Sequence, residues 1–214
     1  MTVRYAIYFA PARDALLWQL GTQWLAQPDL ESLTISARRY GFHATLKAPM
    51  KLSPSSELKS LRDALCSFTE VRPPVALTGL APHMIDGFLA LTADPQPEAL
   101  TALASEVVRE FDDFRELLTL DERERRLKAP LSDRQIELVD LYGYPYVLDQ
   151  FQFHMTLSDR LTEDLQQPLL ERAEAWFAKA LAETVLLDRL VVFAEPEPRA
   201  AFQRLDPDYV LRGP

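Results

Sequence analysis

The sequence predicts an α+β fold built from antiparallel sheets. Strand-like and helix-like segments follow one another without regular alternation, and short turns join several strands into hairpins. A doubly wound parallel sheet would need a crossover helix between consecutive strands, so the hairpins argue against it. One pentapeptide pattern also occurs twice, which predicts two similar halves related by a pseudo-twofold axis.

The N-terminal third is expected to hold two strands and two helices. Residues 3–9 are strand-like, and residues 11–25 form an amphipathic helix because their leucines recur at helical spacing. Residues 39–52 have the pattern of a second strand. Ser53 precedes a proline and resembles a helix N-cap, which predicts a helix that runs to residue 68.

A hairpin and two further helices are expected in the middle third. Residues 75–84 and 88–92 are strand-like, and Asp86-Gly87 between them is a strong turn signal because glycine tolerates positive φ. His83, close to this turn, is expected at the surface. Apolar residues at helical spacing predict a helix over 94–111, and a charged helix with a solvated face is expected over 121–128.

The last third is expected to contain two helices, a strand and a final hairpin. Ser132 with Gln135 three residues later forms a capping box for a helix that ends at Gly143. The remaining elements are expected as a strand over 150–158, a helix to residue 181 with Pro168 in its first turn, and a hairpin of strands 185–194 and 201–205.

Composition places the chain among ordinary globular proteins. It has 214 residues, of which 48% are hydrophobic and 26% are charged, so a disordered chain is excluded. Lys and Arg number 23 against 32 Asp and Glu, and the formal charge of -9 argues against binding to long nucleic acid, whose phosphates it repels. A small anionic ligand is compatible with this charge if positive side chains gather locally.

No cofactor, metal or membrane anchor is expected. Cys66 is the only cysteine, which excludes an intramolecular disulfide and a Cys-rich zinc site. The histidines show none of the spacings of zinc hydrolases, so a metal site built from His43, His154 and a carboxylate is the less favoured alternative. No apolar run is long enough to span a bilayer and the N-terminus lacks a signal-peptide pattern, so we expect a cytoplasmic protein whose oligomeric state is left open.

The feature that carries chemistry is the pattern Phe-His-x-Thr-Leu, which occurs at residues 42–46 and again at 153–157. Side chains alternate across a strand, so His43 and Thr45 share one face of the first copy, and His154 and Thr156 share one face of the second. The alternative is a chance likeness between two half-exposed strands. It is disfavoured because the chain has 3 histidines and two of them occupy the matching positions.

Both copies resemble the two His-x-Thr motifs of the 2H phosphoesterase superfamily, the LigT-like group. The flanking residues 39–49 and 142–154 are similar to a branch of it that is encoded with bacterial phosphonate-metabolism genes. The resemblance implies one bilobal domain over residues 1–214, with interleaved lobes and a helical insertion near 113–149. It further implies two antiparallel sheets that line a central cleft, with the helices outside.

The resemblance assigns the catalytic roles to His43, Thr45, His154 and Thr156. Imidazole titrates near pH ~6.5, so at neutral pH we expect one histidine to act as base and the other as acid without large pKa shifts, in an order that the sequence leaves open. The threonines are expected to donate hydrogen bonds to phosphate oxygens. Lys47 is a candidate substrate contact because it follows His43 and Thr45 on the same face of the predicted strand. The other candidates are Arg39, upstream of it, and Tyr144, Tyr146, Gln152 and Ser158 near the second copy. The alternative is that the two cations are solvated and the tyrosines pack a loop.

These observations favour a metal-independent phosphoesterase that hydrolyses a small cyclic phosphodiester by acid and base catalysis with two histidines. The resemblance implies a phosphoribosyl cyclic phosphate of phosphonate metabolism as the substrate. Two alternatives stay open: a 2',3'-cyclic phosphodiesterase that acts on nucleotides or RNA ends, and a non-catalytic accessory protein that binds a phosphorylated ligand. The expected partner is a small phosphorylated substrate, with neither long nucleic acid nor a membrane.

Overall fold

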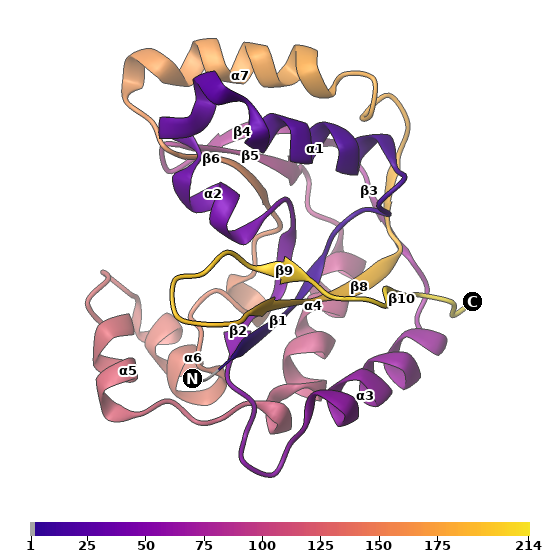
Figure 1. Cartoon of the computed structure of the whole chain (residues 1–214), viewed down its shortest axis with the longest axis vertical. Coiled ribbons are helices and arrows are strands. Elements are labelled where there is room, and N and C mark those ends of the chain that lie inside the picture. Colours follow the sequence, from indigo (N-terminus) through magenta and orange to yellow (C-terminus); the bar gives the residue numbers. More distant parts are fainter. Residues whose placement is uncertain (1–2) are drawn as a thin grey trace.

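Antiparallel strand pairing underlies the fold, which a computed structural model describes for residues 3–214 (Figure 1). The strands are β1 (Arg4–Phe9), β2 (Ala44–Met50), β3 (Val75–Leu77), β4 (Leu80–Ile85), β5 (Phe88–Ala93), β6 (Met155–Arg160), β7 (Val185–Leu187), β8 (Arg189–Glu195), β9 (Gln203–Arg204) and β10 (Tyr209–Val210). An eight-stranded sheet has the order β10-β8-β1-β2-β6-β5-β4, with β9 paired to β8, and β3 and β7 form a two-stranded sheet. Every pair recorded between these strands is antiparallel, which confirms the predicted α+β class.

The eight-stranded sheet consists of two halves that meet at one residue pair. Within residues 3–214, β2 and β6 pair only through Ala44 and Met155. The lower half contains β1, β2 and β8 to β10, and the upper half contains β4 to β6. The sheets expected on the two sides of a cleft are therefore halves of one sheet, joined where the two His-x-Thr motifs meet.

Helices cover the outer side of each half. The helices are α1 (Leu16–Ala26), α2 (Ile35–Tyr40), α3 (Leu58–Glu70), α4 (Glu98–Glu110), α5 (Leu120–Arg126), α6 (Asp133–Tyr142) and α7 (Glu163–Phe177), with short 3-10 turns η1 (Pro28–Leu33), η2 (Asp112–Phe114) and η3 (Leu148–Gln150). Helices α1 and α7 pack on the upper half, and α3 and α4 pack on the lower half (Figure 1). Within residues 3–214, no helix has the length and apolar character needed to cross a bilayer.

The chain passes between the two halves several times. From β1 in the lower half it continues to α1 and α2 above, returns through β2 and α3, rises again for β4 and β5, and later for β6 and α7. The segment 113–149 contains α5 and α6. That the chain is one bilobal domain in which this segment is an insertion stays a prediction.

Aromatic packing holds the start of β2 in place. Phe42 is fully buried, and its ring stacks on that of Phe177 in α7 with the centroids 6.2 Å apart. A Cβ atom at Gly21 would lie 2.3 Å from the Phe42 ring, so only glycine lets α1 approach this closely. The backbone that presents His43 is therefore fixed by the residue before it.

Three local predictions are confirmed. Asp86 and Gly87 have φ values of 46° and 85° and form the turn between β4 and β5. The capping box at Ser132 begins α6, and Gly143 ends it in the left-handed region with φ of 74°. Strands β8 and β9 form the predicted final hairpin.

The expected boundaries near the N-terminus are wrong in three places. Helix α1 begins at Leu16 rather than at residue 11, because the preceding residues form a turn and Ala15 is extended. Residues 39 and 40 belong to α2, which Gly41 ends at φ of 77°, so the strand starts only at Ala44. Helix α3 is capped by Glu57 rather than by Ser53.

Later boundaries also differ from the expectation. The segment 75–84 is divided into β3 and β4 at Gly79, where a Cβ atom would lie 2.3 Å from the carbonyl oxygen of Asp94. The segment 185–194 is likewise divided, into β7 and β8, which belong to different sheets. Strand β6 begins only at Met155, because η3 occupies residues 148–150 and residues 151–154 have no regular secondary structure. Pro168 lies in the second turn of α7, because that helix already begins at Glu163.

Candidate functional site

The two His-x-Thr motifs meet at the single pair that joins the halves of the sheet. Ala44 and Met155, which form this pair, are buried in the core. The residues that flank them, His43 and Thr45 on one strand and His154 and Thr156 on the other, project from the opposite face because side chains alternate along a strand. Antiparallel strands run in opposite directions, so His43 lies toward Thr156 and Thr45 toward His154. The four side chains therefore surround one backbone pair with approximate twofold symmetry.

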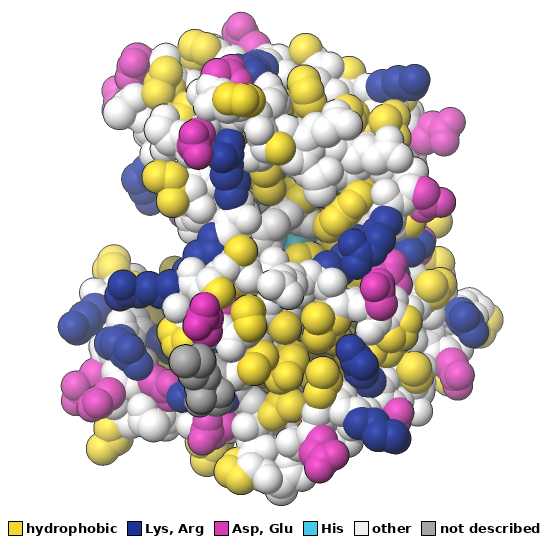
Figure 2. Space-filling model, in the orientation of Figure 1, with side chains coloured by type: hydrophobic (Ala, Val, Ile, Leu, Met, Phe, Trp, Pro, Cys, Tyr) yellow, Lys and Arg dark blue, Asp and Glu magenta, His cyan; other side chains and the backbone are white. Residues whose placement is uncertain are grey.

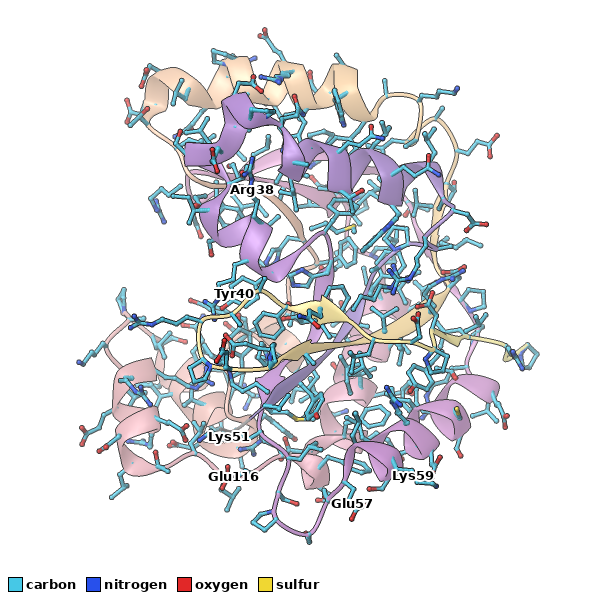
Figure 3. The ribbon with its side chains drawn as sticks, in the orientation of Figure 1. Arg38, Tyr40, Lys51, Glu57, Lys59 and Glu116 are labelled. Atoms are coloured by element: carbon cyan, nitrogen blue, oxygen red, sulfur yellow. The ribbon has the colours of Figure 1, made fainter. Side chains whose placement is uncertain are left out.

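A cavity of about 550 Å³ opens over this group of four residues, and all four line it. Figure 2 shows a hollow between the upper and lower parts of the molecule, with Lys and Arg side chains along its edge and a histidine surface inside it. Tyr40, labelled at the end of α2 in Figure 3, lines the same cavity. The cavity is thus formed by elements of both halves of the sheet.

His43 is held on both of its ring nitrogens. Its Nδ1 lies 2.8 Å from the carbonyl oxygen of Gly41, and because a carbonyl only accepts, Nδ1 carries the proton. Its Nε2 lies 3.2 Å from Oγ1 of Thr45, whose hydroxyl then donates to it. The ring stacks on that of Tyr8 with the centroids 3.8 Å apart. This arrangement leaves Nε2 as the basic nitrogen of His43.

His154 has the equivalent restraint. Its Nδ1 lies 2.9 Å from the carbonyl oxygen of Gln152, two residues earlier, as Gly41 is two residues before His43. Phe88 packs against the ring edge-on with the centroids 5.9 Å apart. Both imidazoles therefore donate from Nδ1 to their own strand and keep Nε2 for proton exchange.

Burial makes both imidazoles weaker bases than free histidine. Loss of water, and to a smaller extent the charge of nearby His154, lowers the pKa of His43 to about 4, against the hydrogen bond to Gly41, which raises it. Burial also lowers the pKa of His154, which is more exposed. The expectation of a histidine pair without large pKa shifts is therefore wrong for His43. A bound anion would raise both pKa values, because negative charge stabilises the imidazolium.

Four of the other predicted residues lie at or beside the cavity. Tyr144 lines it, and burial raises the pKa of its phenol to about 12. Tyr146 and Gln152 line an adjoining cavity of about 250 Å³, which His154 also borders. Ser158 lines the main cavity, but its hydroxyl already accepts from the Leu89 N–H and donates to the Asp159 carbonyl.

In the structure Lys47 does not lie on the strand face that carries His43 and Thr45, so this prediction is wrong. Residues 45 and 47 of β2 pair with the consecutive residues Tyr8 and Ile7 of β1, which marks a β-bulge between them. A bulge breaks the alternation of side chains, so Lys47 turns away and is 3% exposed. Its Nζ donates to the Val108 carbonyl at 3.0 Å and to Asp112 at 2.9 Å.

Arg39 is also directed elsewhere. Its guanidinium binds the carboxylate of Glu195 and donates to the Ala200 carbonyl, and Arg39 is absent from the described residues that line the cavity. Glu195 is 1% exposed and also accepts from Arg4 at 2.5 Å. Arg39 therefore helps to neutralise a buried carboxylate that positions Arg4, which does line the cavity.

Sequence reasoning missed several residues of the cavity wall, among them Tyr8, Arg4, Arg126 and Arg160. Alternation along β1 could have found Tyr8, since it lies on the face opposite Ile7 and Phe9 of the main core. Nothing local marks Arg126, which belongs to the charged segment that was expected to be solvated and is instead half-buried. His83, expected at the surface, is half-buried in β4, with Nδ1 2.6 Å from Oγ1 of Thr92.

Metal ligands are not assembled in the part of the chain that the structure describes. Among residues 3–214, no three His, Cys, Asp or Glu side chains are grouped so that they could hold a metal ion. Proton transfer by imidazole is the chemistry that the arranged side chains can perform.

Comparison with known proteins gives both a family and relatives. Residues 45–203 match a family described as a protein of unknown function (DUF1045). The chain is 35% identical over 221 residues to "Ribose 1,5-bisphosphate phosphokinase PhnN" of Janthinobacterium sp. (strain Marseille), covering 93% of this chain and 49% of that protein. A protein of the same name from Laribacter hongkongensis (strain HLHK9) is 33% identical over 219 residues, covering 94% and 50%. The chain thus spans about half the length of the curated relatives it matches.

A solved structure of E. coli LigT complexed with NADP+ is similar with a TM-score of 0.46 and 13% identity, over 98% of each chain.

Proposed function

The chain belongs to the family described as a protein of unknown function (DUF1045), and we propose that it is a metal-independent phosphoesterase that hydrolyses a small cyclic phosphodiester. The observation that carries the proposal is the paired restraint of the two histidines. His43 and His154 flank one strand pair, each donates Nδ1–H to the carbonyl two residues earlier, and both line one cavity. Two histidines that only stabilised the fold would not need matching hydrogen bonds from Nδ1 or a shared cavity.

The proposed reaction adds water across one P–O ester bond. The Nε2 atom of one histidine takes a proton from water as the water oxygen bonds to phosphorus. The ester bond on the opposite side breaks, and the other histidine gives a proton to the leaving oxygen. The ring opens to a phosphomonoester with a free hydroxyl, and each proton transfer contributes about 10²- to 10⁴-fold in rate.

We assign the base to His43 and the acid to His154. His43 is more buried, and its pKa of about 4 keeps it neutral. His154 is more exposed, so burial disfavours its protonated form less. The negative charge of the substrate would raise both pKa values toward the working pH, which suits proton exchange. Thr45, which donates to Nε2 of His43, can turn its hydroxyl to a phosphate oxygen, and Thr156 would do the same from the other strand.

The relatives support a phosphorylated ribose as the substrate class. Their name is that of a ribose 1,5-bisphosphate phosphokinase, but this chain matches about half of each of them. None of the 6 glycines of this chain is followed by lysine, so the phosphate-binding loop of many kinases is absent from its sequence. We assign the phosphokinase activity to their other half. The sequence resemblance favours a phosphoribosyl cyclic phosphate of phosphonate metabolism as the substrate. We propose a cytoplasmic location for the protein.

The test is hydrolysis of a panel of cyclic phosphates, with product and opened bond read by phosphorus NMR. The panel contains ribose cyclic phosphates, 2',3'-cyclic mononucleotides and a short RNA that ends in a cyclic phosphate. H43A and H154A should each lose activity by at least about 10²-fold, while chelation by EDTA should have no effect. H83A is the matched control, because His83 is the third histidine and lies outside the cavity lining.

Each outcome separates the alternatives. Turnover that survives in the double variant H43A/H154A would overturn the proposed mechanism. Preference for RNA over the ribose compounds would favour the RNA-end phosphodiesterase, although the charge of -9 predicts the reverse. Binding of every cyclic phosphate without turnover would support the non-catalytic accessory protein.

A further inference from the structure

We propose that a second, basic cavity beside the histidine cavity binds a separate phosphate group of the substrate. The substrate class is then a cyclic phosphate that also carries a phosphomonoester at some distance from the ring. This inference rests on the proposed function, and it concerns residues that the catalytic step does not use.

The basic cavity continues from the histidine cavity. Its volume is about 310 Å³, and it lies between β2, α5 and the segment after α6. The two cavities share Arg4, Ala48, Pro49, Arg126 and Tyr144 in their walls. One ligand could therefore reach from the histidines into the basic cavity without leaving the surface of the protein.

Positive side chains dominate the wall of the basic cavity. The acids of the wall are Glu116 and Glu122, and both are directed to Lys51, at 3.9 Å and 2.8 Å. The labels of Lys51 and Glu116 lie close together in the lower part of Figure 3. The cations of the wall are Arg4, Lys47, Lys51, Arg115, Arg125 and Arg126.

Most of these cations already have a carboxylate partner. Lys47 and Arg115 share Asp112, which lies outside the wall. Arg4 is held by the buried Glu195 through its Nε at 2.5 Å, an arrangement that fixes the guanidinium at the junction of the two cavities. The wall has six cations. They are opposed by four carboxylates, two in the wall (Glu116 and Glu122) and two outside it (Asp112 and Glu195), so the cavity has a net positive charge.

Arg126 is the half-buried cation of the wall whose guanidinium has no ion-pair partner among the described residues. Among the described residues, no carboxylate lies within ion-pair distance of its guanidinium and no hydrogen bond is recorded from it. It is half-buried, and burial together with nearby Arg4 lowers its pKa, against the opposing effects of Tyr144 and Glu122. A half-buried guanidinium without a carboxylate partner is free to bind an anion that enters the cavity. Arg126 and Arg4 together offer guanidinium groups whose geometry matches a phosphate.

Helix electrostatics alone do not explain this arginine. The last turn of α5 carries Arg123, Arg125 and Arg126, and cations there are favoured by the helix dipole. Arg123 binds Asp140 on α6, and Arg125 donates back to the carbonyl of Asp121, so both serve the helix. Arg126 instead lines both cavities and faces Tyr144 and Arg4.

The test compares ribose 1,2-cyclic phosphate with and without a 5-phosphate. The wild type should have a kcat/KM about 10- to 100-fold higher for the compound with the 5-phosphate, which is the effect of a charge-assisted hydrogen bond. R126Q should shrink this ratio to near one and weaken the binding of ribose 5-phosphate by a similar factor in calorimetry. K128Q is the matched control, since it removes the same charge two residues away at an exposed position.

The outcomes distinguish this inference from the proposed function. Equal hydrolysis of both compounds by the wild type would overturn the second phosphate site and leave the phosphoesterase intact. Equal loss of the ratio in R126Q and K128Q would reduce the effect to long-range charge, which also overturns it. If neither compound is hydrolysed, the proposed function fails, and calorimetry still decides: tighter binding of ribose 5-phosphate to the wild type than to R126Q supports the site, and equal binding refutes it.

Discussion

Replacing His43 by Gln should make the free energy of unfolding less dependent on pH. The pKa of His43 falls from 6.5 to about 4 when burial removes its water. Between these two values the unfolded chain binds a proton at this residue and the folded protein does not. Stability from the neutral His43 is therefore fully present above pH 6.5 and is lost as pH falls toward 4.

The magnitude follows from the size of the shift. At about 1.36 kcal/mol per pKa unit, the whole window corresponds to about 3 kcal/mol of unfolding free energy. About 2–3 kcal/mol of it should disappear between about pH 7.5 and about pH 4.5. His43 is 9% exposed, so solvent screening does not reduce this figure substantially.

Urea unfolding followed by tryptophan fluorescence measures the effect, because the chain has 3 tryptophans. The wild type should lose about 2–3 kcal/mol more than H43Q between the two pH values. The comparison is a difference of differences, so any constant cost of the substitution cancels. If both proteins lose the same amount, the histidine does not titrate as its burial requires, and its assignment as the neutral base is refuted.

Three further predictions concern the site. Because burial lowers the pKa of both histidines, and catalysis needs one neutral and one protonated, kcat/KM should have its optimum below pH 6.5; a maximum in alkaline solution would contradict this. T45V and T156V should each lower kcat/KM by about 10²-fold with an unchanged circular dichroism spectrum, and near-normal rates would exclude the hydroxyls from the reaction. Arg39→Ala should lower the free energy of unfolding by about 1–3 kcal/mol, because buried Glu195 loses a partner. A raised KM with an unchanged free energy of unfolding would instead make Arg39 a substrate contact.

The sequence determined the chemistry and the local structure around it. Alternation in the two Phe-His-x-Thr-Leu segments places His43 and Thr45 on one face and His154 and Thr156 on one face, because successive side chains on a strand point in opposite directions. The glycine of the turn after β4 and the capping box of α6 were likewise readable, since both depend on neighbouring residues alone.

Only the tertiary structure decided which other side chains reach the cavity. A bulge in the pairing of β1 with β2 places Lys47 on the face away from His43 and Thr45. Arg39 lies at the end of α2, where its guanidinium binds Glu195. Folding also lowers the pKa of His43 and brings Arg126 of α5 to face Arg4 of β1. Local sequence cannot specify these features, because burial, strand register and helix docking depend on residues that are far apart in the chain.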